Sequence, residues 1–321
     1  MQQLLKIINH RDFVLSLALI VGLLLGERAE FLAEISVFTL AMVMVFATTG
    51  FSFSNWWPLR NALLPIGWST LLNYLVFGLS IILLGWIFFR NEPYFNYYIG
   101  IVLLAAAPPG PSVIPFATML RGDDNFSVTG VFGLHLVAML FTPLMLFVFL
   151  GDSLIEPTAI LRIMVQLIVI PLIISRFLRH PRLLPAVSFV RDTVIKWGFF
   201  LVIVPIMGMS ASVFFSEPGP VLIISAIFVF TMYVMGFGYH ILMDKLGFGR
   251  PFLISSTLMM VTKSSAFSAV AAFTFFKTEP MVALPSAVVS VFVTLFIIFY
   301  SLFLKWYESK GNQFSDGRSA N

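Results

Sequence analysis

One lysine, Lys263, lies deep inside a long apolar segment of this 321-residue chain. It stands in the run Thr262-Lys263-Ser264-Ser265, about a dozen residues from either end of the segment. A charge at the centre of a bilayer costs roughly 2.5–3.5 kcal/mol on insertion scales, so such a residue normally has a partner and a function. Snorkelling to an interface is the alternative, and the length of the segment makes that reach difficult.

A second segment combines proline, glycine and serine in the run Pro108-Pro109-Gly110-Pro111-Ser112. Prolines remove backbone donors and clash with the preceding turn, so a helix is interrupted here. In a membrane, the freed backbone groups must be satisfied by protein or by a water-lined cavity. The run therefore predicts a broken helix that lines a site, with a simple kink as the alternative.

A further polar residue, His135, lies inside an apolar segment. A histidine can carry a proton or serve as a neutral hydrogen-bonded packing residue, and the sequence leaves both interpretations open. All 15 Asp and Glu residues fall in loops or near the ends of apolar segments, which disfavours a cationic substrate.

The composition identifies the elements that hold these residues. Hydrophobic residues make up 59% of the chain, charged residues make up 11%, and the mean hydropathy is +0.98. A soluble enzyme, a nucleic-acid-binding protein and a disordered chain are excluded, because a soluble fold of this size cannot bury so much apolar surface. The chain has no cysteine, which excludes disulfides and thiolate metal sites. We find no phosphate loop, dinucleotide fingerprint or metal-ligand cluster and expect no cofactor.

Transmembrane helices need about 20 mostly apolar residues, and ten segments qualify. They are 13–26, 33–52, 61–89, 95–119, 125–150, 157–175, 193–215, 219–243, 251–276 and 281–304. Of the 19 Lys and Arg residues, Arg28, Arg90, Arg162 and Lys277 fall on one side and Lys263 falls within a span; the others fall on the side of the N-terminus. This bias predicts a multi-pass protein of a plasma membrane, such as the bacterial inner membrane, with both termini in the cytoplasm.

The ten spans divide into two sets of five. Residues 1–152 and 153–308 would form two repeats of opposite orientation, followed by a disordered cytoplasmic tail at 309–321. The interrupted fourth and ninth spans are matching members of the two halves. The sequence thus predicts an all-α polytopic membrane protein with a five-plus-five inverted repeat.

Three stretches stand out together: Pro108-Pro109-Gly110, which leads to Gly122-Asp123 and Phe126-Ser127, then 249–276, and finally 283–291. They resemble the bile acid:sodium symporter family, in which the second is similar to the crossing helix of the second half and the third to the opening of the last helix. The resemblance implies a core domain (helices 3–5 and 8–10) beside a panel domain (helices 1, 2, 6 and 7). It also implies that discontinuous helices 4 and 9 cross in the core, and that the substrate is an organic anion.

The family's sodium ligands do not carry over. Their positions fall on Val113 and Ile114, on Leu134 and His135, on Met259 or Met260, and on Lys263-Ser264 or Ser264-Ser265; only Asn73 matches a polar ligand position. Apolar side chains offer sodium no oxygen. The resemblance therefore implies sodium-independent transport, in which the ammonium of Lys263 replaces the bound cation.

The expected protein is a secondary active transporter of a small organic anion that works by alternating access. Its site residues are expected to be Lys263, His135, Asn73, Thr262, Ser264, Ser265, Pro108, Pro109, Gly110 and Ser112. A buried amine can lose its proton, which leaves proton coupling open. The alternatives are a sodium-coupled organic anion symporter and, from other classes, a channel or an intramembrane enzyme that pairs Lys263 with Ser264 or Ser265. Expected partners are the anion, the lipid bilayer and, if coupling exists, protons; sodium and nucleic acid are not expected.

Overall fold

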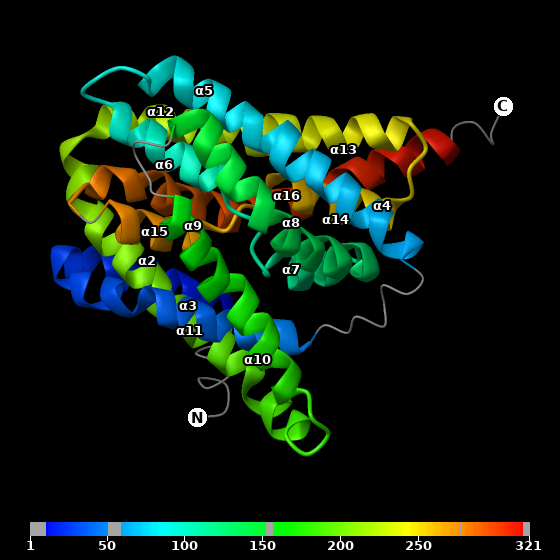
Figure 1. Cartoon of the computed structure of the whole chain (residues 1–321). Helices are drawn as coiled ribbons and strands as arrows, with labels where there is room; N and C mark the ends of the chain where they lie inside the picture. Colours follow the sequence, from blue (N-terminus) through cyan, green and yellow to red (C-terminus); the bar gives the residue numbers. More distant parts are fainter. Residues whose placement is uncertain (1–10, 51–58, 152–156, 277, 317–321) are drawn as a thin grey trace, which may run out of the picture.

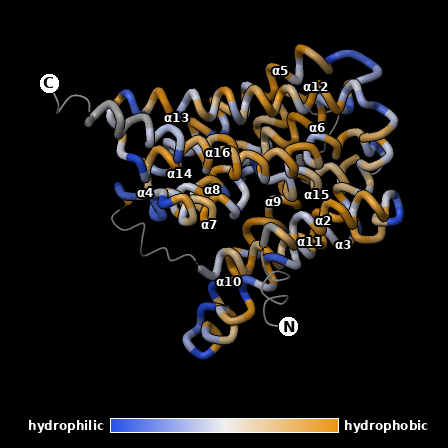
Figure 2. Tube along the Cα trace, turned by 180° about the vertical axis from the view of Figure 1, so that it is seen from behind, coloured by the Kyte–Doolittle hydropathy of each residue, from blue (hydrophilic) through white to orange (hydrophobic). Residues whose placement is uncertain are grey.

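The computed structural model describes residues 11–50, 59–151, 157–276 and 278–316, and helices make up nearly all of this part of the chain (Figure 1). Eight helical stretches are long and apolar enough to cross a membrane. They are Ser16–Thr49, Arg60–Phe89, Asp124–Leu150, Thr158–Leu178, Leu184–Ser216, Pro218–Lys245, Arg250–Phe275 and Pro280–Tyr307. Hydrophobic residues run along the helices and hydrophilic ones gather at the turns (Figure 2). The prediction of an all-α, multi-pass membrane protein is confirmed.

The first stretch consists of two helices. Helix α2 (Arg11–Leu25) and helix α3 (Glu30–Thr49) are joined by the 3₁₀ turn η1 (Gly26–Ala29). Gly26 has a positive φ of 55°, which only glycine adopts at little cost. Both helices pack against the long helix α11 (Leu184–Ser216), because Gly22 of α2 and Gly198 of α11 leave room for close contact.

A further helix completes this group. It consists of α9 (Pro157–Met164), the π-helical η4 (Val165–Val169) and α10 (Ile170–Leu178), and it packs against α3. We call α2, α3, α9, α10 and α11 the first group.

All the other helices form the second group. Two of them have similar interruptions. Helices α4 (Arg60–Thr70) and α5 (Leu79–Phe89) flank the π-helical η3 (Leu71–Gly78). Helices α12 (Pro218–Phe228) and α13 (Met235–Lys245) flank the π-helical η5 (Val229–Val234). π-Helical turns often lie at functional sites because they redirect side chains, and Asn73 lies in η3.

Two long helices also belong to this group. Helix α8 (Asp124–Leu150) begins at Asp123, whose carboxylate accepts a hydrogen bond from the backbone N of Phe126. Helix α16 (Leu284–Asp316) follows the 3₁₀ turn η6 (Pro280–Ala283). Because α16 continues to Asp316, the helix covers most of the segment expected to be a disordered tail; residues 317–321 lie outside the described part.

Each of the two remaining segments is split into halves. Helices α6 (Phe95–Ala106) and α7 (Val113–Met119) occupy the expected span 95–119. Helices α14 (Arg250–Val261) and α15 (Ser265–Phe275) occupy the expected span 251–276. Ala107 is extended, with φ −67° and ψ 144°, directly before the prolines. Both predicted interruptions are therefore present.

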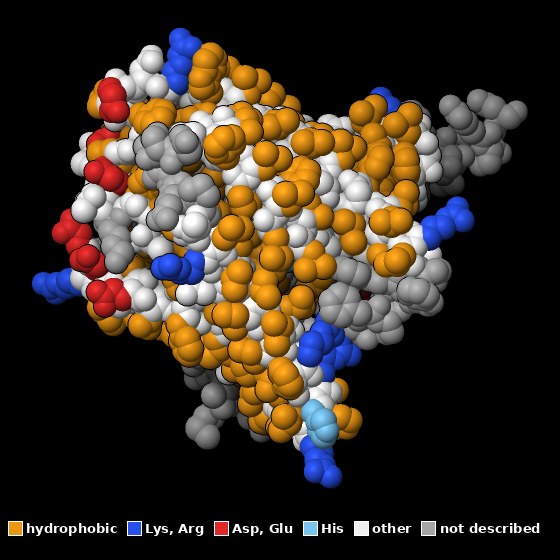
Figure 3. Space-filling view, viewed as in Figure 1, with side chains coloured by type: hydrophobic (Ala, Val, Ile, Leu, Met, Phe, Trp, Pro, Cys, Tyr) orange, Lys and Arg blue, Asp and Glu red, His pale blue; other side chains and the backbone are white. Residues whose placement is uncertain are grey.

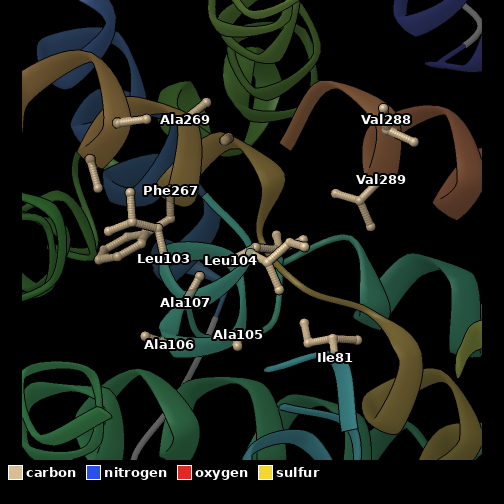
Figure 4. Packing of buried hydrophobic residues seen from close by; sticks show 14 of the residues in the cluster. Ile81, Leu103, Leu104, Ala105, Ala106, Ala107, Phe267, Ala269, Val288 and Val289 are labelled. Carbon is tan, nitrogen blue, oxygen red and sulfur yellow. The ribbon is translucent and has the colours of Figure 1, made fainter. Parts of the chain in front are cut away.

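Small side chains surround the end of α6. Leu103 to Ala107 are buried, and Figure 4 shows them among Ile81 of α5, Phe267 and Ala269 of α15, and Val288 and Val289 of α16. Because Ala105 to Ala107 are small, the backbone of this break approaches its neighbours closely. The break is held by packing on several sides rather than by a regular helix.

The two halves of each broken helix have different neighbours. Helix α15 packs against α3 and α11 of the first group, and α16 and η6 also contact α11. By contrast, the main packing partners of α7 are α8 and α14, and those of α14 are α4, η3, α7, α8 and α13. The two groups are therefore packed together mainly through α15, η6 and α16.

Candidate functional site

The two helix breaks are in direct contact. The backbone N of Ser264 donates a hydrogen bond of 3.0 Å to the carbonyl oxygen of Pro108. A Cβ atom on Gly110 would lie 4.0 Å from the Cα atom of Ser264. The structure thus brings together Pro108, Gly110 and Ser264, which lie more than 150 residues apart in the sequence, as expected for two interrupted helices that build one site.

Lys263 is at the centre of this contact and is 2% exposed. Its Nζ atom donates to the side-chain oxygen of Asn73 at 2.7 Å, to the carbonyl of Ala105 at 2.7 Å and to the carbonyl of Ala107 at 3.0 Å. The nitrogen also lies 4.3 Å from the centre of the Tyr74 ring. These three acceptors use all three hydrogens of an ammonium group, so Nζ has no hydrogen left to donate to a ligand.

Asn73 connects the lysine to the other broken helix. While its oxygen accepts from Lys263, its Nδ2 atom donates to the carbonyls of Met259 at 2.8 Å and Thr262 at 3.1 Å. These carbonyls belong to the end of α14, where regular helical hydrogen bonding stops. Thr262 thus contributes a backbone oxygen, and the pair Lys263–Asn73 satisfies carbonyls at the ends of both α6 and α14.

His135 makes a local contact instead. Its Nδ1 atom lies 2.7 Å from the carbonyl oxygen of Val131, one turn earlier on α8. Since a carbonyl only accepts, Nδ1 carries the hydrogen in this arrangement. This histidine is buried, and this hydrogen bond joins it to its own helix rather than to Lys263.

A cavity of about 70 Å³ lies beside the two breaks. Its polar side chains are mostly hydroxyl groups. Residues of the breaks that line it are Gly110, Ser112, Lys263, Ser264 and Ser265. Ser264 also caps α15, because its Oγ atom accepts from the backbone N of Phe267 at 3.2 Å.

The opposite walls come from other helices. Leu19 of α2 together with Phe199 and Ile203 of α11 form an apolar wall, and Ser290 and Thr294 of α16 add two more hydroxyl groups. The cavity therefore lies between the first and second groups of helices. One side is apolar, and the other offers hydroxyl groups and the first turn of α15.

Several residues of the site were not predicted from the sequence. Ser290 and Thr294 are four residues apart on one helix face, a spacing that could have singled them out. The carbonyl groups of Ala105 and Ala107 leave no signal in the residue types, and Tyr74 looks like any other aromatic residue of an apolar segment.

Apolar helices that cross a membrane, two of them broken around a buried charge and a cavity, are typical of secondary transporters. The chain belongs to the sodium bile acid symporter family, because residues 37–235, more than half of its length, match the model of that family. A comparison with curated proteins gives no match. The protein is therefore a membrane transporter with a small-molecule substrate and not an enzyme, and the Ser/Lys enzyme considered above is excluded.

Proposed function

We propose that the protein transports a small organic anion without sodium, and that Lys263 is a tethered cation that replaces the bound ion. The observation that carries this proposal is the set of three oxygen atoms at 2.7–3.0 Å around Nζ. Carbonyl and amide oxygens are ligands that also suit a hard metal cation. An ammonium group that occupies such a set holds the charge at the helix breaks permanently.

The sodium-coupled alternative lacks ligands in this chain. Val113, Ile114 and Leu134 are apolar where the family resemblance calls for polar ligands, and Met259 or Met260 replaces the family's glutamate. The positive charge of Lys263 would also repel a sodium ion placed beside it. Both features favour a cycle in which sodium plays no part.

Proton coupling through Lys263 is disfavoured by its hydrogen bonds. A neutral amine has two hydrogens and a lone pair, which would point at one of the three acceptors. The site therefore suits the charged form. His135 remains the candidate for a proton site, and anion flux that follows an imposed pH gradient would support that role.

The anion is proposed to bind in the cavity rather than on Lys263, because the ammonium hydrogens are already donated. Ser112 and Ser265 supply hydroxyl donors there, whereas Ser290 and Thr294 donate their hydrogens to the carbonyls of Ala287 and Ser290 and only line the wall. The first turn of α15 adds the positive end of a helix dipole. A small carboxylate fits this mixture of donors and one apolar wall.

The ten-span inverted repeat is supported by two equivalent contacts. A Cβ atom on Gly100, in α6, would clash with the carbonyl oxygen of Val282, just before α16. Ser255, in α14, donates to the carbonyl of Asp123, just before α8, at 2.9 Å. Gly100 and Ser255 each lie seven residues before the interruption of their helix. The eight apolar stretches become ten spans when α2 and α3 are counted as two spans and α6 with α7 is added as one.

The cavity is proposed to be accessible from the side of the membrane on which α7 and α14 lie. These inner half-helices pack mainly within the second group, whereas α15 closes the other side against α3 and α11. Acidic side chains gather at the end of the molecule where α2 turns into α3 (Figure 3). Together with the excess of Lys and Arg at the opposite end, this arrangement supports cytoplasmic termini and an inward-facing state.

A thermal-shift screen tests the proposal directly. Purified protein is unfolded in the presence of monocarboxylates, dicarboxylates and sulfonates, with the amide and amine of the same carbon skeletons as controls. We expect an anion to raise the unfolding temperature equally in sodium and in N-methylglucamine buffers. Loss of the shift in Ser112→Ala/Ser265→Ala would support the cavity. A sodium requirement, or stabilisation by the amines instead, would contradict the proposal.

A further inference from the structure

The turn between α10 and α11 carries the densest basic segment of the chain. We call residues 176–191 the basic hairpin; it contains Arg176, Arg179, His180, Arg182 and Arg191 and no Asp or Glu. Figure 1 shows that it projects beyond the neighbouring helices, and Figure 3 shows basic and hydrophobic side chains side by side on this projection. The transport site does not involve it.

The hairpin starts at the level where its neighbour α3 ends. A Cβ atom on Gly50, at the end of α3, would lie 2.7 Å from the Nη1 atom of Arg191. From Arg191, helix α11 extends back to Leu184, a distance of about 10 Å at 1.5 Å per residue. The hairpin therefore begins where the apolar helix α3 ends and extends outward from there.

Its surface combines two chemistries. Phe177 is 71% exposed and Phe189 is 87% exposed. Arg179 lies one turn after Arg176, close enough for the two like charges to repel each other. Arg182 is exposed, and Arg179 is half-buried, with an Nη1 atom that is shielded from solvent and has no hydrogen-bond partner within the described residues.

We propose that the basic hairpin binds the headgroups of anionic phospholipids. Phe177 and Phe189 would enter the boundary of the acyl chains, while Arg179 and Arg182 donate to lipid phosphates. A soluble acidic partner would leave both phenylalanines without an apolar environment, whereas a lipid satisfies both chemistries. Because the hairpin joins two helices of the first group, bound lipid would hold that group at one leaflet, which the proposed orientation makes the cytoplasmic one.

Binding is tested with the full-length protein in mixed micelles that contain either phosphatidylglycerol or phosphatidylcholine. Native mass spectrometry counts the bound lipids, and the unfolding temperature reports their effect. Each basic residue at a membrane surface changes lipid binding about five-fold, so Arg179→Gln/Arg182→Gln should weaken binding of phosphatidylglycerol about 25-fold. The matched control is Arg28→Gln/Arg90→Gln, which removes the same charge at the opposite end and should bind as the wild type does. Equal unfolding temperatures in phosphatidylcholine would show that the variants are folded.

The possible outcomes separate the sources of binding. Equal loss in both double variants, or equal binding of the two lipids by the wild type, would overturn the proposal. Competition by millimolar inorganic phosphate as strong as that by phosphatidylglycerol would assign the site to a free anion and overturn it as well. The assay measures no transport, so its failure would leave the proposed transport function untouched, and the converse also holds.

Discussion

The side chains of Lys263 and Asn73 form a hydrogen bond of 2.7 Å across 190 residues of sequence. This bond joins the break of one interrupted helix to the π-helical turn η3 of another. Through it, one positive charge and one amide satisfy carbonyls at the ends of both α6 and α14. Removal of either side chain would leave buried polar groups without partners, so the two residues should act as a unit.

Replacement of Asn73 by leucine should destabilise the protein. The substitution keeps the branched shape of the side chain but leaves Lys263 and the carbonyls of Met259 and Thr262 without their partner. Buried unsatisfied groups cost about 1–3 kcal/mol each, so we expect a loss of about 3 kcal/mol or more. Thermal or denaturant unfolding of the purified variant measures this loss.

A double-mutant cycle measures the interaction energy between Asn73 and Lys263 separately from the contacts that each makes with other groups. Asn73→Leu combined with Lys263→Met should cost less than the sum of the two single variants, with a coupling of at least about 1 kcal/mol. Strictly additive losses would mean that the hydrogen bond contributes nothing specific to stability.

The close contact between α6 and η6 predicts a strong effect of one methyl group. A Cβ atom on Gly100 would clash with the backbone oxygen of Val282 and would lie 2.9 Å from the ring of Pro285. Gly100→Ala should therefore lower the unfolding temperature or abolish folding, because overpacking against backbone costs about 1–3 kcal/mol or more.

Gly67 provides the matched control for this glycine. It also lies in a helix, and an added Cβ atom there would meet nothing within 4 Å. Gly67→Ala should be neutral or stabilising by up to about 1 kcal/mol, because alanine favours the helix. Similar effects of the two substitutions would argue against the contact on which the inverted repeat rests.

The absence of native cysteine allows the cavity to be probed with single cysteines. Ser112→Cys, at the cavity, should react with a small water-soluble maleimide applied from the side of α7. Ser286→Cys should stay unlabelled, because that side chain is fully buried and hydrogen-bonded to Ser268. Labelling of Ser112→Cys only from the opposite side would contradict the proposed inward-facing state.

The sequence was sufficient for the features that have a strong physical signature. The prolines at 108–111 can only interrupt a helix, and a lysine inside an apolar segment must find partners, so the breaks and the lysine could be predicted as parts of one site. The short first two spans were also recognisable, since Glu27 and Arg28 mark a turn, although the structure runs them together through η1.

Other features depend on where the backbone goes in space. The oxygens of Ala105 and Ala107 become ligands of Lys263 only because α6 ends there in an extended residue. Tyr74 is placed by the π-helical turn, and such turns have no clear sequence signal. The sequence leaves His135 open between a proton site and a packing residue, and its hydrogen bond to the carbonyl of Val131 is a local contact that residue types alone do not predict.

The most direct test of the tethered cation compares three proteins in sodium and in N-methylglucamine. Lys263→Ala leaves three oxygens around an empty space that sodium can enter, whereas Lys263→Met leaves the same oxygens but fills the space. We expect both variants to be destabilised by about 3 kcal/mol or more, since they leave buried acceptors without a partner. Sodium should raise the unfolding temperature of Lys263→Ala alone, with no effect on the wild type or on Lys263→Met. Sodium stabilisation of the wild type, or none in Lys263→Ala, would contradict the account.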